Sequence, residues 1–410
     1  MSGKGPLVAL AAGTIVSVGG TRISTIAVPW LVLTTTGDPI LTGLAGMAEL
    51  LPYVVAKALG GPLIDRIGAR RIAVRCDCLS ALAVASVPLL FWLSLLSIWV
   101  LLPAVALIGA LRAPSDAAKQ ALVPSVAAMG RTPLERVTGI MGASDRLAGT
   151  LGAAGAGGLI VLVGAAPALL ANAAAFLISA LVVGLGIPHI ARDGEATGPG
   201  AGTSYRSELA AGWATLRAEP VLVGLVVMIA ATNLFDQAYA TVLLPVWVRS
   251  SNLDASWVGL FLAAFSAAAI IGAAMAAAYA ERLPRLLIYT IGFLCAGPAP
   301  LIALALALPL PTILATLLAC GFAAGFLNPI IGAILFERIP SAMVGRVIAL
   351  VGALTWTLMP FGGLYAGVLV DMFGMTSALC ATATLYLCAA LVPLLVPSFR
   401  EMNRRPARAD

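Results

Sequence analysis

The polar segment between the second and third apolar runs reads GPLIDRIGARR, from Gly61 to Arg71. It holds one aspartate, three arginines and two glycines, and it separates apolar stretches at residues 41–60 and 72–93. Each stretch is about 20 residues long, the length that a helix needs to cross a bilayer core about 30 Å thick. The segment is therefore predicted to be a charged loop at one face of a membrane.

The rest of the chain repeats this alternation of long apolar runs and short polar loops. The 410 residues are 61% hydrophobic and 10% charged, with a mean hydropathy of +1.03. Soluble domains carry about 25% charged residues, so a single water-soluble core is excluded. The apolar runs cover residues 7–33, 41–60, 72–93, 98–123, 138–163, 168–187, 221–248, 257–280, 286–306, 312–336, 347–370 and 376–396. We predict an all-α membrane protein of twelve transmembrane helices in two pseudo-symmetric six-helix halves.

The longer polar segments between the apolar runs predict the domain boundaries. The predicted halves are residues 1–188 and 220–398, joined by a linker at 189–219 and followed by a tail at 399–410. The linker begins with a glycine-rich polar stretch and then becomes amphipathic from 205 to 217, which predicts a short surface helix. Almost all loop arginines fall on one side, Arg249 being the exception, so both termini and the linker are predicted to be cytoplasmic. We expect a multi-pass protein of the inner or plasma membrane.

An internal repeat supports the two halves. A shift of 216 residues superposes several small and charged residues: Pro29 on Pro245, Gly43 on Gly259, Leu44 on Leu260, Asp65 on Glu281 and Arg66 on Arg282. A shift of 210 residues does the same further along: Arg136 on Arg346, Gly142 on Gly352, Gly152 on Gly362 and Gly157 on Gly367. Six-helix halves around a central site are a recurring plan of secondary transporters.

The loop from Gly61 to Arg71 resembles the G-x-L-a-D-r-x-G-r-k signature of the major facilitator superfamily. Residues 149–158 are similar to the helix-five motif of its antiporter branch, G-x-x-x-G-P-x-x-G-G, with Ala153 or Ala154 where proline is expected. Arg112 stands where drug antiporters often have a buried arginine, and a turn is expected at Ala113-Pro114. The whole chain resembles the macrolide-efflux-like drug:proton antiporters, which implies the major facilitator fold.

The resemblance implies a cytoplasmic gate in the charged loop, where Asp65 meets the positive end of a helix that opens near Gly345-Arg346-Val347. The gate residues are Gly61, Asp65, Arg66, Gly68, Arg70 and Arg71. The alternative is that the arginines only fix topology. The glycine motif of helix five comprises Gly149, Gly152, Gly155, Gly157 and Gly158.

Charged residues inside apolar runs are functional candidates because a charge in the bilayer core costs several kcal/mol. The candidates for proton or ion coupling are Arg22, Glu49, Asp236, Arg112 and Asp145. Depth counting places the first three near the midplane, which predicts a pair of Arg22 with Glu49 or Asp236. It places Arg112 and Asp145 lower, as a second pair. Static ion pairs, snorkelling of Arg22 and a structural network with Asp77, Asp116, Lys119 and Arg146 are the alternatives.

Polar and aromatic side chains on the expected cavity helices are candidates for substrate contact, with plain packing as the alternative. They are Trp30, Tyr53, Asn233, Gln237, Asn328 and Trp356. An apolar cavity with few fixed charges favours a lipophilic or amphipathic solute.

We expect a secondary transporter that exports such a molecule by proton-coupled alternating access. Uptake or facilitation, translocation of a lipid or siderophore, and a non-transporting sensor are the alternatives. The sequence has no G-x-x-x-x-G-K-[ST] loop, so the proton motive force is the expected energy source. We expect no enzyme activity, cofactor, metal or nucleic-acid partner; membrane lipid and the small substrate are the expected contacts, and the functional unit is expected to be a monomer.

Overall fold

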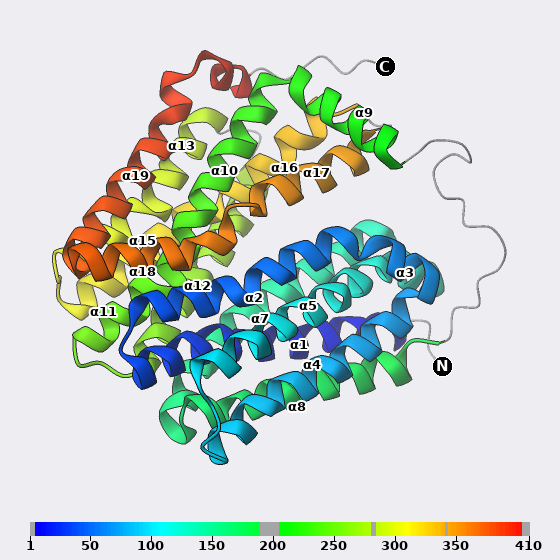
Figure 1. The fold of residues 1–410 in the computed structure, drawn as a ribbon. Coiled ribbons are helices and arrows are strands. Elements are labelled where there is room, and N and C mark those ends of the chain that lie inside the picture. The colour runs from blue at the N-terminus through cyan, green and yellow to red at the C-terminus, as the bar shows by residue number, and fades with distance from the viewer. Residues whose placement is uncertain (1–4, 189–204, 280–283, 341–342, 404–410) are drawn as a thin grey trace. The chain divides into compact units, whose positions relative to one another are not determined.

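The computed structural model describes residues 5–188, 205–279, 284–340 and 343–403, and these ranges contain helices and no strand. The first six membrane spans are α1 (Gly5–Thr36), α2 (Pro39–Leu59), α4 (Ala69–Trp92), α5 (Ile98–Ala121) continued by α6 (Val123–Met129), α7 (Leu134–Val163) and α8 (Ala165–Gly186). The short helix α3 (Gly61–Ile67) lies in the charged loop (Figure 1).

Several of the last six spans are broken or bent. They are α10 (Pro220–Ala238) with the π-helical turn η1 (Tyr239–Leu243) and α11 (Leu244–Ser250), α12 (Ala255–Tyr279), α13 (Arg285–Ala296) with α14 (Pro298–Ala305), α15 (Leu310–Gly325) with α16 (Leu327–Arg338), α17 (Val344–Trp356) with η3 (Met359–Phe361) and α18 (Gly362–Phe373), and α19 (Met375–Leu395). Helix α9 (Tyr205–Ala218) precedes them and η4 (Pro397–Asn403) follows. Proline accompanies several breaks, as is tolerated in membrane helices.

The twelve predicted spans are confirmed among the described residues. Their bounds agree within three residues except in the fourth, which continues to Met129 through α6 where the prediction ended it at residue 123. Pro124 lies in the first turn of α6, where a proline is compatible with a helix. The turn expected at Ala113-Pro114 is wrong, because Pro114 lies inside α5.

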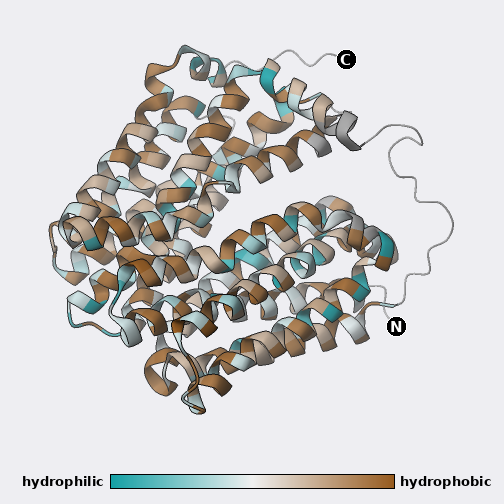
Figure 2. Cartoon of the chain, viewed as in Figure 1, coloured by the Kyte–Doolittle hydropathy of each residue, from teal (hydrophilic) through white to brown (hydrophobic). Residues whose placement is uncertain are grey.

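Large apolar side chains remain exposed along the spans. Leu162, Leu185 and Trp99 are 82%, 76% and 74% exposed, and Figure 2 shows apolar residues along most helices. Such surfaces on long helices match lipid chains rather than water. The protein is therefore a multi-pass membrane protein.

The described chain divides into two compact units that do not follow chain order. Unit 1 comprises Met1–His189, Gln237–Ser266 and Pro360–Met375, and unit 2 comprises Ile190–Asp236, Ala267–Met359 and Thr376–Asp410. The predicted halves at 1–188 and 220–398 instead kept all six later spans together. The difference arises because α11, the first part of α12 and α18 pack tightly against the first six spans.

Glycines make this packing possible within unit 1. A Cβ added to Gly43 on α2 would lie 2.1 Å from the carbonyl oxygen of Gly363 on α18. A Cβ added to Gly259 on α12 would lie 2.5 Å from the carbonyl oxygen of Ala153 on α7. Both helix pairs therefore approach backbone to backbone, which a side chain would prevent.

These two crossings are copies related by the internal repeat. The shift of 216 relates Gly43 to Gly259, and the shift of 210 relates Ala153 to Gly363. The same rule holds one turn away: Cβ atoms on Gly367 and Gly157 would lie 2.4 Å from the Pro39 carbonyl oxygen and 2.8 Å from the Ala255 carbonyl oxygen. The repeat found in the sequence thus corresponds to one helix crossing made twice.

Unit 2 extends beyond the predicted end of its last span. Phe399 and Met402 of η4 are 1% and 0% exposed, and a Cβ on Gly224 would lie 2.7 Å from the Phe399 ring. The predicted tail at 399–410 thus begins inside η4, where Phe399 and Met402 are buried. The predicted surface helix at 205–217 is found as α9, which packs on α17 and buries Leu216.

We expect Gly43→Ala and Gly259→Ala each to destabilise the protein by about 1–3 kcal/mol, because the new methyl group forces two backbones apart. The measurement is the thermal unfolding midpoint of purified protein in detergent. Gly155→Ala is the matched control, since a Cβ there meets nothing within 4 Å. Equal midpoints for all three variants would contradict the proposed role of the crossings.

Candidate functional site

The crossing of α2 and α5 brings two buried charges together. A Cβ added to Gly109 on α5 would lie 2.0 Å from the carbonyl oxygen of Glu49 on α2. Arg112 follows Gly109 by three residues, so it lies on the same face of α5, one turn along. The close approach at the glycine therefore places Arg112 beside Glu49.

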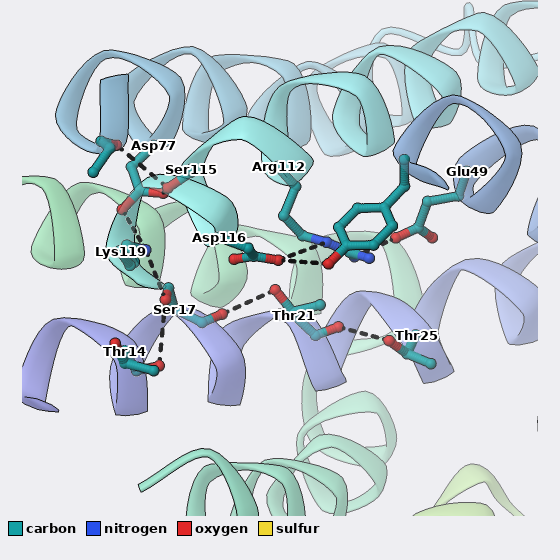
Figure 3. A network of polar contacts seen from close by, with 12 residues as sticks. Thr14, Ser17, Thr21, Thr25, Glu49, Asp77, Arg112, Ser115, Asp116 and Lys119 are labelled. Atoms are coloured by element: carbon teal, nitrogen blue, oxygen red, sulfur yellow. Dashed lines mark hydrogen bonds and ion pairs between the residues drawn. The ribbon is translucent and has the colours of Figure 1, made fainter. Parts of the chain in front are cut away.

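Arg112 and Glu49 form a buried ion pair (Figure 3). The Nη1 atom of Arg112 donates to Oε1 of Glu49 over 2.7 Å, and the two residues are 9% and 8% exposed. The guanidinium also lies 4.4 Å from the ring centre of Tyr53, one turn after Glu49. An arginine stacked on an aromatic face gains attraction from the ring quadrupole.

A second carboxylate competes for the same arginine. Nε of Arg112 lies 3.9 Å from Oδ2 of Asp116, and the Tyr53 hydroxyl donates to that oxygen over 3.1 Å. Nε completes no hydrogen bond among the described residues. Lys57 contacts the Tyr53 ring, with Nζ 5.5 Å from its centre. The Arg112 guanidinium thus lies between the Glu49 carboxylate, to which it is hydrogen-bonded, and the Asp116 carboxylate, which is a second nearby partner.

A separate polar cluster ties four helices of unit 1. Asp77 on α4 is fully buried and lies 2.8 Å from Nζ of Lys119 on α5. The hydroxyls of Ser115 and Ser179 donate to its two oxygens over 2.5 and 2.7 Å, and Lys119 donates to Ser17 of α1 over 2.9 Å. With its oxygens so satisfied, this buried carboxylate acts as a joint of α1, α4, α5 and α8. Figure 3 shows both clusters along α5.

The predicted partner of Arg112 is wrong. The sequence paired it with Asp145, whereas the structure pairs it with Glu49 and leaves Asp145 exposed. Depth was misjudged because the fourth span was ended at residue 123 rather than at Met129. The longer span places Arg112 about 9 Å deeper in the membrane than the prediction did. The long arginine side chain spans the remaining distance to Glu49.

The expected pair of Arg22 with Glu49 is also replaced. Arg22 is exposed and its guanidinium packs beside α7, where a Cβ on Gly149 would lie 3.5 Å from Nε. Asp145 lies one turn before Gly149 on the same helix and attracts Arg22 electrostatically. The two arginines have thus exchanged their predicted neighbours, because α1 packs on α7 and α2 packs on α5.

The glycines of the helix-five motif, on α7, pack against two neighbouring helices. Gly149 and Gly152 face α1, and a Cβ on Gly152 would lie 2.8 Å from the carbonyl oxygen of Gly19. Gly157 faces α12, where a Cβ would lie 2.8 Å from the Ala255 carbonyl oxygen. Gly155 and Gly158 have open space where a Cβ would stand. Two of the five, Gly152 and Gly157, therefore have a packing reason for lacking a side chain.

The candidate substrate residues fall into different environments. Tyr53 is buried in the Arg112 network, and the Asn233 amide donates to the carbonyl oxygen of Thr355 over 2.9 Å. The others are half-buried or exposed: Trp30, Gln237 and Trp356 are half-buried, and Asn328 is exposed. Asp236 lies on α10 in unit 2, exposed, with the Tyr386 side chain against it.

The charged loop shows why two of its residues are needed. Gly68, between α3 and α4, has φ of +96°, a conformation that favours glycine. Arg70 donates to the backbone carbonyl oxygen of Gly184 near the end of α8. Gly61 begins α3, and Arg66 and Arg71 are exposed. The side chains of Asp65 and Arg346 lie outside the described part of the structure, so the predicted gate contact does too.

Sequence reasoning missed the ion pairs at one end of unit 2. Arg285 donates two hydrogen bonds to the Glu337 carboxylate, over 2.6 and 2.7 Å, and Arg338 pairs with Glu219 at 3.2 Å. Arg338 also donates to the backbone carbonyl oxygen of Glu401. The position of these charged residues at helix ends is the feature of the sequence that could have predicted the pairs.

No group of three or more His, Cys, Asp or Glu residues suited to a metal occurs in the described ranges.

Comparison with known proteins places this architecture in a family. The model of the Major Facilitator Superfamily matches residues 10–307 and 226–409. The multidrug efflux pump Tap of Mycobacterium tuberculosis (strain ATCC 25618 / H37Rv) is 28% identical over 414 residues, covering 99% of this chain and 96% of that protein. Tap of Mycolicibacterium fortuitum is 28% identical over 411 residues, covering 98% of each.

Solved structures share the fold at low identity. The nucleoside transporter NupG matches with a TM-score of 0.75 at 14% identity, over 97% of this chain and 99% of that chain. A bacterial homolog of the human lysosomal transporter Spinster, inward-facing and unoccupied, matches with a TM-score of 0.72 at 13% identity, over 98% and 96%. These likenesses concern the fold alone.

We expect Arg112→Met to destabilise the protein by about 3–5 kcal/mol, because it leaves Glu49 buried without a counter-charge. Glu49→Leu combined with Arg112→Met is expected to recover most of that loss, since no unpaired charge then remains. Thermal unfolding in detergent measures both, with the exposed Arg249→Met as control. A double variant no more stable than the single one would show that the pair matters by its packing and not by its charge.

Proposed function

Because the chain belongs to the major facilitator superfamily, we propose that it is a secondary transporter that exports lipophilic or amphipathic small molecules in exchange for protons. Its relatives over nearly the whole chain are named multidrug efflux pumps. The sequence lacks a nucleotide-binding loop, which favours an ion gradient as the energy source. We also propose a cytoplasmic position for both termini, from the one-sided arginines, and a monomeric functional unit.

The observation that carries proton coupling is the sharing of Arg112 between two carboxylates. Glu49 holds the guanidinium at 2.7 Å, and Asp116 lies 3.9 Å from its unbonded Nε. Protonation of Glu49 would cancel the charge that holds Arg112, and the guanidinium would then turn towards Asp116. One proton thereby exchanges one ion pair for another without leaving a bare charge in the membrane.

The exchange acts on a helix that also forms one of the glycine crossings. Glu49 and Gly43 lie on the same helix, α2, which contacts α5 at Gly109 and α18 at Gly363. Releasing the ion pair weakens the contact between α2 and α5. The crossing of α2 with α18 is sensitive to this change, because it requires α2 to keep its position. A proton on Glu49 can therefore bias the contacts between α2 and its two neighbours, which is what coupling to a conformational change requires.

We expect Glu49→Gln to abolish the dependence of export on a pH gradient. In proteoliposomes loaded with a lipophilic dye such as ethidium, the wild type should export dye when a pH gradient is imposed and stop when an uncoupler is added. The variant, which cannot exchange a proton at this position, should retain substrate counterflow only.

Asp371→Asn, an exposed carboxylate on α18, is the matched control and should transport like the wild type. Wild-type dye accumulation driven by the gradient in the opposite direction would establish uptake instead of export. Full gradient-driven export by Glu49→Gln would exclude this residue as the coupling group and leave Asp236 as the candidate.

The charged loop is proposed as the gate on the arginine-rich side. The resemblance assigns Asp65 to this gate, and the fixed positions of Gly68 and Arg70 support a rigid loop geometry. We expect Asp65→Asn to insert and unfold like the wild type but to export dye at least about tenfold more slowly, because a gate contact worth about 1.4 kcal/mol is lost. Expression, unfolding midpoint and initial export rate are measured on the same preparations. Export at the wild-type rate would leave topology as the sole role of the loop.

A further inference from the structure

Two cysteines lie opposite each other where the ninth span packs on the tenth. Cys295 is near the end of α13, and Cys320 is in α15. Both belong to unit 2 and both are free thiols. The ninth span and the tenth, which comprises α15 and α16, follow each other in the chain and cross the membrane in opposite directions. Two contacts between them show which residues of the two spans face each other.

The first contact is at the arginine-rich end of the two spans. Arg285, at the start of α13, donates to the carboxylate of Glu337, near the end of α16, over 2.6 and 2.7 Å. The second contact lies seven residues further along α13. A Cβ added to Gly292 would lie 2.5 Å from the Leu327 side chain and 3.4 Å from the carbonyl oxygen of Ala323. The missing side chain at residue 292 therefore lets the two antiparallel helices approach closely.

One further turn brings the two thiols together. Cys295 follows Gly292 by three residues, so it lies on the same face of α13. Cys320 precedes Ala323 by three residues, so it lies on the same face of α15. Because the helices are antiparallel, these two steps lead to the same level of the contact. The two thiol groups also interact electrostatically, which agrees with this register.

The other four cysteines do not meet in this way on their own helices. Cys76 and Cys78 on α4 are two residues apart, a spacing at which side chains do not face each other. Cys380 and Cys388 on α19 are eight residues apart, about 12 Å along the helix, and both are exposed. The pair between α13 and α15 differs because its thiols come from two packed helices and Cys320 is only 4% exposed.

The surroundings of this pair select the kind of ion that it can hold. A structural Zn²⁺ site needs four protein ligands, and no group of even three suitable residues occurs in the described ranges. A soft ion that prefers two sulfur ligands in line needs only the two thiolates. Two thiolates carry two negative charges, so a divalent ion gives a complex without net charge. Neutrality matters because Cys295 lies about 15 Å into its span, where a net charge is costly.

We propose that Cys295 and Cys320 form a binding site for the mercuric ion, Hg²⁺, which is divalent, soft and two-coordinate with thiolates. On binding, each thiol releases one proton to water and two sulfur–mercury bonds form, and no group is oxidised or reduced. The bound ion joins α13 to α15 within unit 2. The site goes beyond the proposed export function and does not depend on it, because it requires only that the two helices pack as they do.

The test counts thiols and mercury in the purified full-length protein. One variant keeps only the pair and carries Cys76→Ala, Cys78→Ala, Cys380→Ala and Cys388→Ala. We expect one equivalent of mercuric chloride to protect both of its thiols from a maleimide, as measured by mass spectrometry of the intact protein, whereas zinc chloride should protect neither. Half-removal of the mercury should need at least about tenfold more reduced glutathione than in the same variant with Cys320→Ser, because the second thiol is held beside the first.

A matched control keeps two thiols that the fold does not bring together. It retains Cys380 and Cys388 and has alanine at the other four positions, and its mercury should be removed as easily as from the single-thiol variant. A reactive thiol left in the pair after one equivalent, or release at the glutathione concentration of the control, would overturn the inference. If the four alanines prevent folding, Cys295→Ser and Cys320→Ser are made in the wild type. Each should then lower the glutathione-resistant mercury by one ion per protein, and an unchanged count would equally reject the site.

Discussion

A charged side chain in the hydrocarbon core of a membrane is costly unless it is paired. In unit 1, close helix crossings at glycine residues bring opposite charges near enough to pair. Glu49 and Arg112 each occupy a position where an unpaired charge would be strongly destabilising. Their helices approach closely enough to pair them only because residue 109 has no side chain, since a Cβ there would lie 2.0 Å from the Glu49 carbonyl oxygen. Backbone packing and charge neutralisation are thus one arrangement at this point.

The repeat-related crossings extend this constraint to the conformational behaviour of the chain. Gly43 with Gly363 and Gly259 with Ala153 are the same contact formed in two copies. Such contacts bury little side-chain surface and contain no interdigitated side chains. The two helices can therefore pack closely and separate again without rearranging large side chains. A transporter that must open and reclose gains from contacts of this kind, whereas a static membrane protein would gain more from interlocking leucines.

Much of the fold could be predicted from the sequence, because length and apolarity report on each helix separately. The span limits, the helix α9 and the repeat all follow from patterns along the chain. Partner choice does not, since it depends on which helices are neighbours. Depth counting placed Arg22, Glu49 and Asp236 at one level, but α2 contacts α5 and α1 contacts α7, so Glu49 met Arg112 instead. The burial of Phe399 was missed for a similar reason: its receiving surface beside Gly224 is distant in sequence.

The charge arrangement differs between the two units in a way that bears on coupling. In unit 1, the carboxylates Glu49, Asp116 and Asp77 are each within reach of a cation of the chain, so a proton there changes which internal pair is formed. In unit 2, Asp236 has the Tyr386 side chain against it and forms no ion pair with the described residues. An internal exchange of ion pairs can change the conformation without leaving an unpaired charge in the membrane. Under the proposed coupling, one proton gradient would drive that exchange of ion pairs and so favour one conformation over the other, as alternating access requires.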